Sequence, residues 1–491
     1  MGLTEISLVE FWNRLVSLEV RTRAIERRFG TLQLYALQRT RIFYALANAV
    51  GLFDDPHPHF TKPESAEGSL PQGWQKLVPE ARDVIVPFRR RVAGAEPYSD
   101  SIVAKLLKES ESIRVLDFNL PSEPSSAAKG IIPELNLELL RRQFAVDEAK
   151  AVERIMRFTS RRPQVHGWQK LISEFEAEFG VSLEKFKKYP QWFVRRTLAE
   201  QRGFEKLFRQ MKTKSLYIVN AYSEPSIVLG ARRAGVKVHE IQHGFISQLH
   251  PAYSFGPVTQ SEYIAESLAH NDAKNKPTRK KIGPRLDASP DELLTWGTFW
   301  GSDVVLPRGT KLRVTGATLP FETYRTLALS ENRIINKQVL FSSQGAIANQ
   351  LFKAAYETAL KLPDYTIIYR LHPNESLADF ETLLEKQNRL TEASGGQPPK
   401  NLQLSHRHPI FLDLVSQSEY LIGAFSTTLY EGLALGCKVL VLPIAGVENV
   451  RPAIAAGDIT LITSLDEIST ALLSARKAVN PEKYYARDEN A

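Results

Sequence analysis

The sequence predicts an α/β fold with two doubly wound parallel sheets and extra helices at the N-terminal end. Three observations lead to this prediction. From Ser215 onward, short apolar runs of strand length alternate with segments of helix length. Most of these runs are apolar on successive residues, as expected for parallel strands that are buried on both faces. The chain has 491 residues, which is too long for one ordinary core, so two or three domains are expected.

The N-terminal part of the chain is predicted to be mainly helical. Apolar positions recur at helical spacing from Ser7 to Leu52, with an interruption near Gly30, and predict two helices. The stretch from Asp54 to Gly73 carries Pro and Gly and predicts a loop, whereas residues 112–118 predict a strand. Residues 147–212 predict several further helices, broken at Pro163 and Pro190.

The remaining apolar runs form two series. Residues 215–222 and 236–244 enclose a helical segment, which is the spacing of a right-handed βαβ unit, and residues 292–297 and 311–316 extend the same sheet. A second series begins at Gln338, with the runs QVLFSSQG, YTIIYRLHP, NLQLS, EYLIGAF, KVLVLP and ITLIT. The predicted domains are therefore residues 1–330 and 331–491.

Composition excludes several classes of protein. A single cysteine, Cys437, provides neither a disulfide framework nor a multi-cysteine zinc site. No apolar run approaches the length of a membrane span, and the first residues are acidic where a secretory signal is basic, so we expect a cytoplasmic protein. The absence of G-x-G-x-x-G and Walker motifs argues against a dinucleotide oxidoreductase and a P-loop NTPase.

The formal net charge of +8 favours an anionic partner. Basic residues cluster at Lys185 to Lys214, with aromatic residues between them, and again at Lys274 to Arg285. The first cluster is interpreted as an amphipathic helix with a solvated basic face, in preference to a patch for a membrane surface or a nucleic acid. The second cluster is interpreted as a mobile loop between strands.

Polar residues follow the predicted strands, where ligands of open α/β sheets bind. In the first sheet these are Tyr222, Ser223 and Glu224, then Gln242, His243 and Gly244. In the second sheet they are Ser342, Ser343, Gln344 and Gly345, then His372 and Pro373, then Ser426, Thr427 and Thr428.

Two of these strand ends point to an anionic ligand. In RLHPNE, Arg370 ends a strand, His372 can donate to a phosphate oxygen and Pro373 stops the strand, although such a histidine can also merely cap a loop. In FSTTLYEG, the helix start and the hydroxyls of Ser426 and Thr427 can bind an anion, and Glu431 is placed to accept from a ribose diol. A helix N-cap with a first-turn acid explains the same residues.

The segment VHEIQHGFISQLHPAY carries Glu240, His243, His250 and Tyr253. His243 has an unperturbed pKa close to working pH and can remove a proton from an acceptor hydroxyl. Glu240 is predicted to point to the opposite face of the strand, so the two are not expected to pair directly. The irregular spacing of His239, His243 and His250 argues against a zinc site.

At these motifs the chain resembles the GT-B glycosyltransferases of bacterial capsule and lipopolysaccharide assembly. The resemblance is to transferases of Kdo and sialic acid that use CMP-sugars, and to teichoic-acid polymerases that use CDP-polyols. It depends on IQHGFIS followed by HPAY, on RLHPNE and on FSTTLYEGLALGCKVLVLP, and it covers about Ser215 to Pro443. Ser426-Thr427 stands where a Ser-Ser pair is typical, and the acidic-Gly motif that supplies the base in those enzymes is absent.

The resemblance implies two Rossmann-like domains that face a cleft, with the acceptor bound by residues 1–330 and the donor by residues 331–491. The implied donor site comprises Ser342, Gln344, Gly345, Arg370, His372, Pro373, Ser426, Thr427, Thr428 and Glu431. The candidate catalytic residues are Glu224, Glu240 and His243, and the acceptor-side residues are Gln242, Gly244, His250 and Tyr253. No cofactor or metal is expected, because no Asp-x-Asp signature appears and basic groups and helix N-termini can offset phosphate charge.

The resulting hypothesis is a glycosyltransferase that moves a sugar from a CMP-sugar to an oligosaccharide or lipid-linked acceptor at the inner membrane face. Peripheral contact with an anionic membrane is part of this hypothesis, and no nucleic-acid partner is expected. The alternatives are a nucleotide-sugar epimerase of the same architecture, a CDP-polyol phosphotransferase, and a non-enzymatic module that binds carbohydrate or a polyanion.

Overall fold

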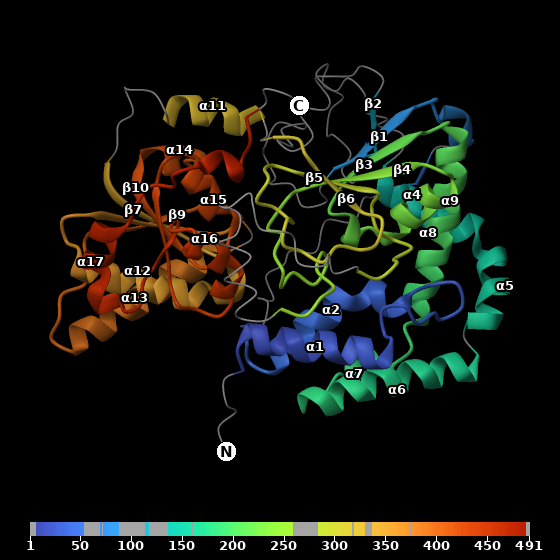
Figure 1. Ribbon diagram of the computed structural model, residues 1–491, viewed down its shortest axis with the longest axis horizontal. Helices are drawn as coiled ribbons and strands as arrows, with labels where there is room; N and C mark the ends of the chain where they lie inside the picture. The colour runs from blue at the N-terminus through green and yellow to red at the C-terminus, as the bar shows by residue number, and fades with distance from the viewer. Residues whose placement is uncertain are drawn as a thin grey trace, which may run out of the picture.

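Two six-stranded parallel sheets form the framework of the protein (Figure 1). The computed structural model describes residues 6–53, 69–70, 72–87, 113–116, 136–159, 161–258, 283–316, 319–328, 336–373 and 375–487. Within these ranges every strand pairing of the two sheets is parallel. The predicted α/β fold with two Rossmann-like domains is therefore confirmed.

The first sheet has the order β2-β1-β3-β4-β5-β6. Its strands are β1 (Asp83–Val86), β2 (Ile113–Val115), β3 (Ser215–Val219), β4 (Lys237–Ile241), β5 (Glu292–Thr295) and β6 (Lys311–Val314). Five of these strands fall in the predicted runs, whereas β1 was not predicted, because its four residues stand alone between unpatterned segments. The predicted loops at residues 54–73 and 274–285 lie mostly outside the described residues.

The second sheet has the order β12-β11-β10-β7-β8-β9. Its strands are β7 (Asn336–Ser342), β8 (Thr366–Arg370), β9 (Leu402–Ser405), β10 (Ser418–Gly423), β11 (Lys438–Val441) and β12 (Thr460–Leu461). Each of the six overlaps a predicted run, although β7 begins two residues and β10 one residue earlier than predicted. Numbered along the chain, this is the order 3-2-1-4-5-6, in which the winding reverses between β7 and β10, and ligands of such sheets bind outside the carboxyl ends of the strands at this point.

Helices cover both faces of the second sheet, because alternate residues of each strand point to opposite faces. On one face, Val339 and Ile367 pack against α12 (Ala348–Lys361), α13 (Leu377–Ala393) and α17 (Ile468–Ser474). On the other face, Leu340 and Leu421 pack against α14 (Phe411–Gln417), α15 (Thr427–Ala434) and α16 (Arg451–Ala455). Apolar residues on both faces explain why these strands lack polar alternation.

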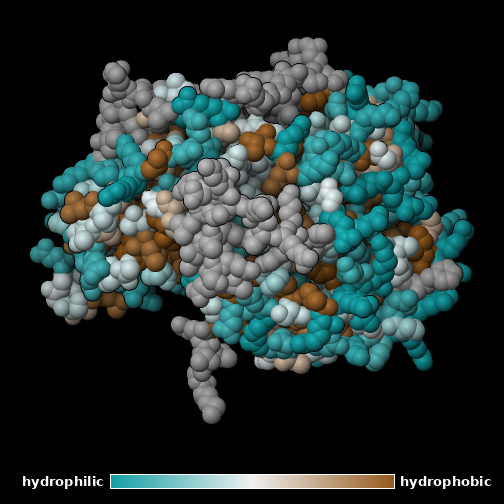
Figure 2. All heavy atoms as spheres, viewed as in Figure 1, coloured by the Kyte–Doolittle hydropathy of each residue, from teal (hydrophilic) through white to brown (hydrophobic). Residues whose placement is uncertain are grey.

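In the first domain, α4 (Leu137–Asp147), α8 (Gln191–Gln210) and α9 (Pro225–Arg233) cover one face of the sheet. Two glycines allow these helices to pack closely. A Cβ atom on Gly203 would lie 2.1 Å from the ring of Phe144, and one on Gly230 would lie 2.6 Å from Phe204, so a larger residue would clash at either position. Hydrophilic side chains predominate on the outer surface of this domain in the view of Figure 2.

The N-terminal helices form a separate layer with its own core. It comprises α1 (Leu8–Thr22), α2 (Leu34–Ala49), α6 (Arg162–Phe179), α7 (Glu184–Lys187) and part of α8, and α5 (Ala149–Thr159) joins it. Ser7 caps α1 by accepting from the Glu10 amide at 3.2 Å. Gly30 has φ +65° between α1 and α2, at the interruption that the sequence predicts. The predicted helices are confirmed here.

The chain crosses between the domains twice. Residues 319–328 form α11 (Leu319–Ala328), which contacts α14, so this helix packs with the second domain although the predicted boundary follows it. The C-terminal end returns to the first domain, where the Ala486 amide donates to the Trp296 carbonyl at 2.8 Å. Short 3-10 turns complete the described structure: η1 (Trp74–Leu77), η2 (Ala221–Ser223), η3 (Gly345–Ile347), η4 (Val447–Val450), η5 (Leu465–Glu467) and η6 (Pro481–Lys483).

Candidate functional site

The carboxyl ends of β7 and β10 are joined by a hydroxyl pair. Ser342 ends β7, and its Oγ lies 2.8 Å from the Thr428 Oγ1 in the first turn of α15. Ser342 is only 4% exposed. The structure therefore gives this predicted donor residue a supporting role, in which it holds the start of α15 against the tip of β7.

The start of α15 combines a helix cap with two side chains that are not engaged. Ser426 is the N-cap, and its hydroxyl accepts from the Thr428 amide at 3.3 Å, as the capping alternative predicted. Thr427 and Glu431 are one turn apart on the same helix face. Both are half-buried, and within the described residues neither side chain makes a hydrogen bond or an ion pair. Burial raises the pKa of Glu431 to about 7.

The tip of β7 offers open space and an unsatisfied amide. Around Gly345 no atom lies within 4 Å of the position that a Cβ would take. The Oε1 atom of the preceding Gln344 is buried and has no hydrogen-bond partner in the part of the chain that the structure describes.

The tip of β8 presents His372 and Pro373 at the surface. Glu375 holds this tip, because its carboxylate accepts from the His372 amide at 2.7 Å and from the Ser343 hydroxyl at 2.9 Å. β8 and β10 both pair with β7 and not with each other. His372 and Ser426 therefore flank the end of β7, each about 5 Å to one side at the usual strand spacing.

In this structure the side chain of Arg370 binds the loop that follows β9. Its side chain is 8% exposed, and its guanidinium donates to the Ser405 hydroxyl at 2.8 Å and to the carbonyls of Pro409 and Arg407 at 2.7 and 2.9 Å. The predicted contact with a nucleotide stays a prediction, and in this structure the guanidinium is held by three neutral oxygens. Its hydrogen bonds hold the loop that follows β9.

In the first domain, the predicted residues after β3 and β4 come together in an aromatic cluster. The ring of Tyr222 lies 6.0 Å from His243, 5.8 Å from His250 and 5.6 Å from Tyr253, measured between centroids. Glu240 joins the cluster by accepting from the Tyr253 hydroxyl at 2.9 Å. Glu240 and His243 are therefore linked through Tyr253 and Tyr222. Of these residues, Tyr222 was not among the predicted site residues.

Burial controls the protonation of this cluster. It lowers the pKa of His243 to about 4, and it lowers the pKa of His250 to about 3 with smaller effects from His243 and Arg39. It raises the pKa of Glu240 to about 7 against the hydrogen bonds from Tyr253 and the Ala221 amide. Both imidazoles are consequently neutral near neutral pH, and His243 can accept a proton. A cavity of about 70 Å³ borders Tyr222, Glu240 and Tyr253.

Three predicted residues of the first domain have structural roles instead. Glu224 is buried, and its carboxylate is paired with the guanidinium of Arg141. The same guanidinium lies 3.6 Å from Glu200. Gln242 is fully buried, and its amide donates to the Gly244 carbonyl and accepts from the Trp296 amide. Gly244 lies in a bend after β4, with no positive φ and with open space at its Cβ position, so the backbone there does not require glycine.

The loop after β4 reaches the second domain beside α15. Phe245, two residues after His243, lies 5.6 Å from the ring of Tyr430, which precedes Glu431. The Ser247 hydroxyl donates to the Asn449 Oδ1 at 2.6 Å. The loop that follows β4 therefore packs against α15 and the 3-10 turn η4 of the second domain.

The N-terminal helices hold this loop in place, which the sequence did not predict. Arg39 of α2 is 1% exposed and forms an ion pair with Glu19 of α1 at 2.6 Å. The same guanidinium donates to the carbonyls of Pro251 and Ser254, both at 2.6 Å. Trp12 adds a hydrogen bond from its indole to the Gly256 carbonyl at 2.9 Å. The only sequence signal was the charge of Glu19 and Arg39 inside apolar helices.

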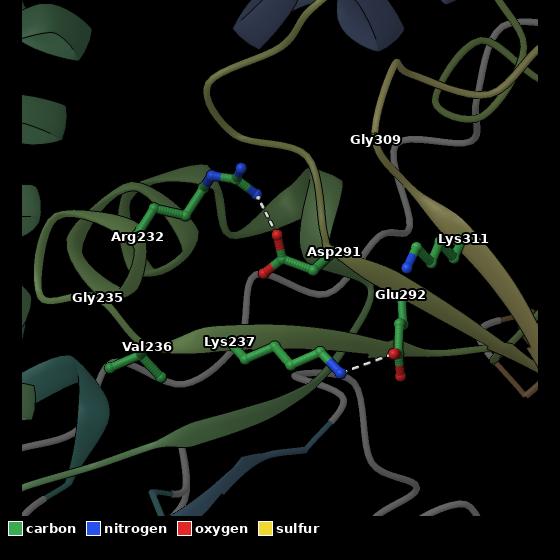
Figure 3. Close-up of a pocket in the computed structure, with 8 residues that line it drawn as sticks. All are labelled: Arg232, Gly235, Val236, Lys237, Asp291, Glu292, Gly309 and Lys311. Carbon is green, nitrogen blue, oxygen red and sulfur yellow. Dashed lines mark hydrogen bonds and ion pairs between the residues drawn. The ribbon is translucent and has the colours of Figure 1, made fainter.

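A separate pocket of about 460 Å³ lies at the amino ends of β4, β5 and β6, away from the strand ends described above (Figure 3). Its charges are largely paired, since Arg232 contacts Asp291 and Lys237 contacts Glu292. The ring of His239 is stacked on Tyr217, and its Nδ1 atom lies 3.0 Å from Glu292. Among the described residues, no group of three or more His, Cys, Asp or Glu side chains could hold a metal ion.

Within the ranges that the structure covers, no helix is both long and apolar enough to cross a bilayer. No protein-family model matches the sequence, and no curated protein matches it significantly.

Several solved structures show a distant likeness. The UDP-GlcNAc 2-epimerase of Methanocaldococcus jannaschii, in complex with UDP-GlcNAc and UDP, is 12% identical, with 83% of this chain and 96% of that chain covered and a TM-score of 0.39. MurG of Acinetobacter baumannii is 13% identical, with coverages of 80% and 91% and a TM-score of 0.37. A glycosyltransferase of Rickettsia africae is 12% identical, with coverages of 82% and 91% and a TM-score of 0.38. These likenesses are too distant to bear on function, and the fold class follows from the two strand orders.

Proposed function

We propose that the protein is a glycosyltransferase that transfers a sugar from a nucleotide-sugar to a hydroxyl of an oligosaccharide or lipid-linked acceptor. One observation carries this proposal. Thr427 and Glu431 stand unengaged at the point where the winding of the second sheet reverses, and α15 contacts the loop that bears His243. In the proposed site, the anion-binding start of α15 and the neutral imidazole of His243 act on one ligand between the two domains.

In the proposed complex, the donor phosphate lies above the end of β7. His372 and Ser426 flank it, and the backbone N–H groups at the start of α15 point toward it. Glu431 accepts from the ribose hydroxyls, for which its position one turn beyond Thr427 is suitable. The choice of a CMP-linked donor such as a Kdo or sialic-acid donor depends on the resemblance of RLHPNE and FSTTLYEG alone.

The proposed reaction needs one base and one stabilised leaving group. His243 takes the proton of the acceptor hydroxyl while the acceptor oxygen forms a bond to the anomeric carbon of the donor. The bond between that carbon and the phosphate oxygen breaks, and the nucleotide leaves with the electron pair. The start of α15, Thr427 and His372 offset the charge that develops on the leaving phosphate.

A nucleotide screen tests the donor site. CMP, CDP, UDP and GDP are compared for their effect on the melting temperature, since a ligand at a hundredfold excess over its Kd stabilises by about 2.7 kcal/mol. Glu431→Gln should weaken binding of the stabilising nucleotide roughly tenfold. Glu392→Gln, on the exposed face of α13, is the matched control. Failure of every nucleotide to stabilise the protein, with salt-sensitive binding of polyanions, would favour a non-enzymatic binding module.

Turnover assays separate the enzymatic alternatives. A transferase consumes the CMP-sugar only with acceptor, an epimerase converts its nucleotide-sugar without one, and a CDP-polyol phosphotransferase releases CMP from CDP-glycerol. His372→Ala should abolish transfer while circular dichroism shows an unchanged fold. Retained transfer would remove His372 from the site.

A further inference from the structure

We propose that the loop His406–Pro409 at the carboxyl end of β9, together with Arg370 beneath it, is a second oxyanion-binding element. It would take a phosphate or carboxylate in addition to the phosphate above β7. This inference rests on the proposed function, because the second negative charge is assigned to the nucleotide-sugar whose first phosphate lies above β7.

The first support is a buried positive charge without a negative partner. The guanidinium of Arg370 donates only to neutral oxygens, those of Ser405, Arg407 and Pro409. Within the described chain it forms no ion pair, and its side chain is 8% exposed. Burying an unpaired charge is unfavourable, and an anion bound above the loop would offset that cost.

The second support is the conformation and exposure of the loop. Arg407 has φ +61°, a left-handed conformation that is uncommon for a residue with a branched or long side chain. Arg407 and His408 are exposed, and among the residues that the structure describes the Arg407 guanidinium makes no hydrogen bond or ion pair. Strained residues of this kind concentrate at ligand sites, where the surrounding structure holds them in place.

The third support is the surplus of positive and imidazole groups at this end of the sheet. His372 at the tip of β8 adjoins the loop, because Arg370 pairs with Ser405 across β8 and β9. The Nε2 atom of His406 is buried and lacks a hydrogen-bond partner within the described ranges. Glu375, which contacts the tip of β8, already accepts from the His372 amide and the Ser343 hydroxyl.

Strand spacing relates this element to the first phosphate. β9 is two strands from β7, which places the loop about 10 Å from the end of β7. The second oxyanion would therefore lie above the end of β8, between the first phosphate and the loop and about 5 Å from each, a separation that neighbouring oxyanions of one ligand can span. The second oxyanion is either the β-phosphate of a nucleoside diphosphate or the carboxylate of an acidic sugar linked to a nucleoside monophosphate.

The first experiment tests the anion site without any nucleotide. Inorganic pyrophosphate is titrated while the ring signals of His406 and His408 are followed by NMR. In Arg407→Asn the charge is lost, but asparagine tolerates the left-handed conformation, so the fold should persist. We expect at least a fivefold weaker Kd in this variant and no change in Lys400→Asn, which removes an exposed charge just before the amino end of β9. Equal affinity in Arg407→Asn and the wild type would overturn the proposal.

The second experiment identifies the source of the oxyanion. Kd values are compared for CMP, CDP and CMP-linked N-acetylneuraminic acid. We expect one of the two larger ligands to bind about tenfold tighter than CMP, and Arg407→Asn to remove this advantage. An advantage of CDP identifies a phosphate, and an advantage of the sialic-acid donor identifies a carboxylate. An advantage that survives in Arg407→Asn contradicts the inference. Binding of pyrophosphate without binding of any nucleotide contradicts the proposed function and leaves the anion site standing.

Discussion

Burial sets the protonation of the side chains that the proposed reaction uses. Glu240 and Glu431 both have a pKa raised to about 7, and His243 has a pKa lowered to about 4. In each case the low-polarity surroundings favour the neutral form. Glu240 and Glu431 therefore titrate near neutral pH, and perturbed groups of this kind are typical of functional sites.

The pH dependence of activity should report the lowered pKa of His243. A general base must be neutral, so kcat/KM should stay level from pH 8 down to about 5 and fall only near pH 4, instead of falling below 6.5. His243→Gln should reduce kcat by about 10² to 10⁴. The profile is measured with the CMP-sugar that turns over, and circular dichroism at each pH shows that the fold persists. A fall in kcat/KM centred on pH 6.5 would contradict a buried base.

The pH dependence of stability should report Glu240. Its folded pKa of about 7 exceeds its unfolded value of 4.5, so the folded protein keeps a proton that the unfolded chain releases between these values. The stabilisation is fully present below pH 4.5 and is lost as the pH rises through 7. Each pKa unit corresponds to about 1.4 kcal/mol, so the loss is on the order of 3 kcal/mol.

Glu240→Gln tests this, because glutamine keeps an oxygen acceptor for Tyr253 and carries no charge. The free energy of unfolding of the variant, relative to the wild type, should rise by about 3 kcal/mol from pH 4.5 to pH 8. Urea unfolding at several pH values measures it. Parallel curves for the two proteins would show that Glu240 does not titrate in this range.

At the scale of elements, the α1–α2 hairpin is a support for the loop after β4. The buried pair of Glu19 and Arg39 lies beneath the loop segment from Pro251 to Ser254, with Arg39 also 4.4 Å from the centroid of the Phe255 ring. Asn13 extends the contact, since its Oδ1 accepts from the Val258 amide at 2.8 Å. The helices at the N-terminal end therefore position a strand-end loop more than 200 residues further along the chain.

Glu19→Gln should loosen this loop specifically. Breaking a buried pair leaves Arg39 uncompensated and costs about 3 to 5 kcal/mol. Amide exchange at residues 253–255 should accelerate more than exchange in the second sheet, as measured by hydrogen exchange with mass spectrometry. Glu178→Gln is the control, because it removes a partly exposed pair between α6 and Arg21 of α1 and should cost less than about 1 kcal/mol. A uniform increase in exchange would indicate general destabilisation instead.

At the scale of the whole molecule, the C-terminal segment ties the domains together. The Tyr484 hydroxyl donates to Asp458 of the second domain at 2.7 Å, while the Tyr484 carbonyl accepts from the Trp300 indole of the first domain at 2.7 Å. Tyr485 stacks on Trp296 at 5.2 Å between centroids and on Phe321 at 4.4 Å. One apolar cluster contains residues of both sheets, so the junction resembles a core more than a loose contact.

Removal of residues 481–491 should uncouple the domains. The full chain is expected to unfold in one calorimetric transition, and the truncated chain in two, because the shared cluster loses its central tyrosines. Removal of residues 488–491 alone serves as the control. A single transition in the longer truncation would show that the remaining interface suffices for coupling.

The helices of the first domain are also the place where we propose contact with an anionic membrane. Residues 148–196 hold eleven lysines and arginines against six acids. Trp192 at the start of α8 is 67% exposed, and the nearby Lys185 and Lys188 are exposed without ion pairs in the described chain. An exposed indole beside basic residues is suited to the interface of a bilayer.

Vesicle sedimentation tests this contact. The protein should bind vesicles that contain phosphatidylserine, and added salt should weaken the binding. Trp192→Ser should reduce the partition coefficient roughly tenfold. Leu473→Ser, which removes an 82% exposed apolar side chain in the second domain, is the control. Equal loss in both variants would remove the specific role of Trp192.

The sequence by itself determined the order of helices and strands and the ends of the strands at which polar residues gather. This was possible because most of the doubly covered parallel strands are apolar on successive residues, and because Pro163, Pro190 and Gly30 mark the ends of helices. The short strand β1 was not predicted, since the four residues DVIV without a neighbouring pattern do not distinguish a strand from a loop.

Only the tertiary structure decided what each polar strand-end residue does. Arg370, Gln242 and Glu224 have the residue types of a site, yet their donors and acceptors are satisfied by partners that are distant in sequence. Tyr222, Arg39 and the His406–Pro409 loop matter through contacts made across strands and domains. The hydrophobic period of a sequence is local and can be read along the chain, whereas satisfaction of a polar group depends on which segments fold beside it.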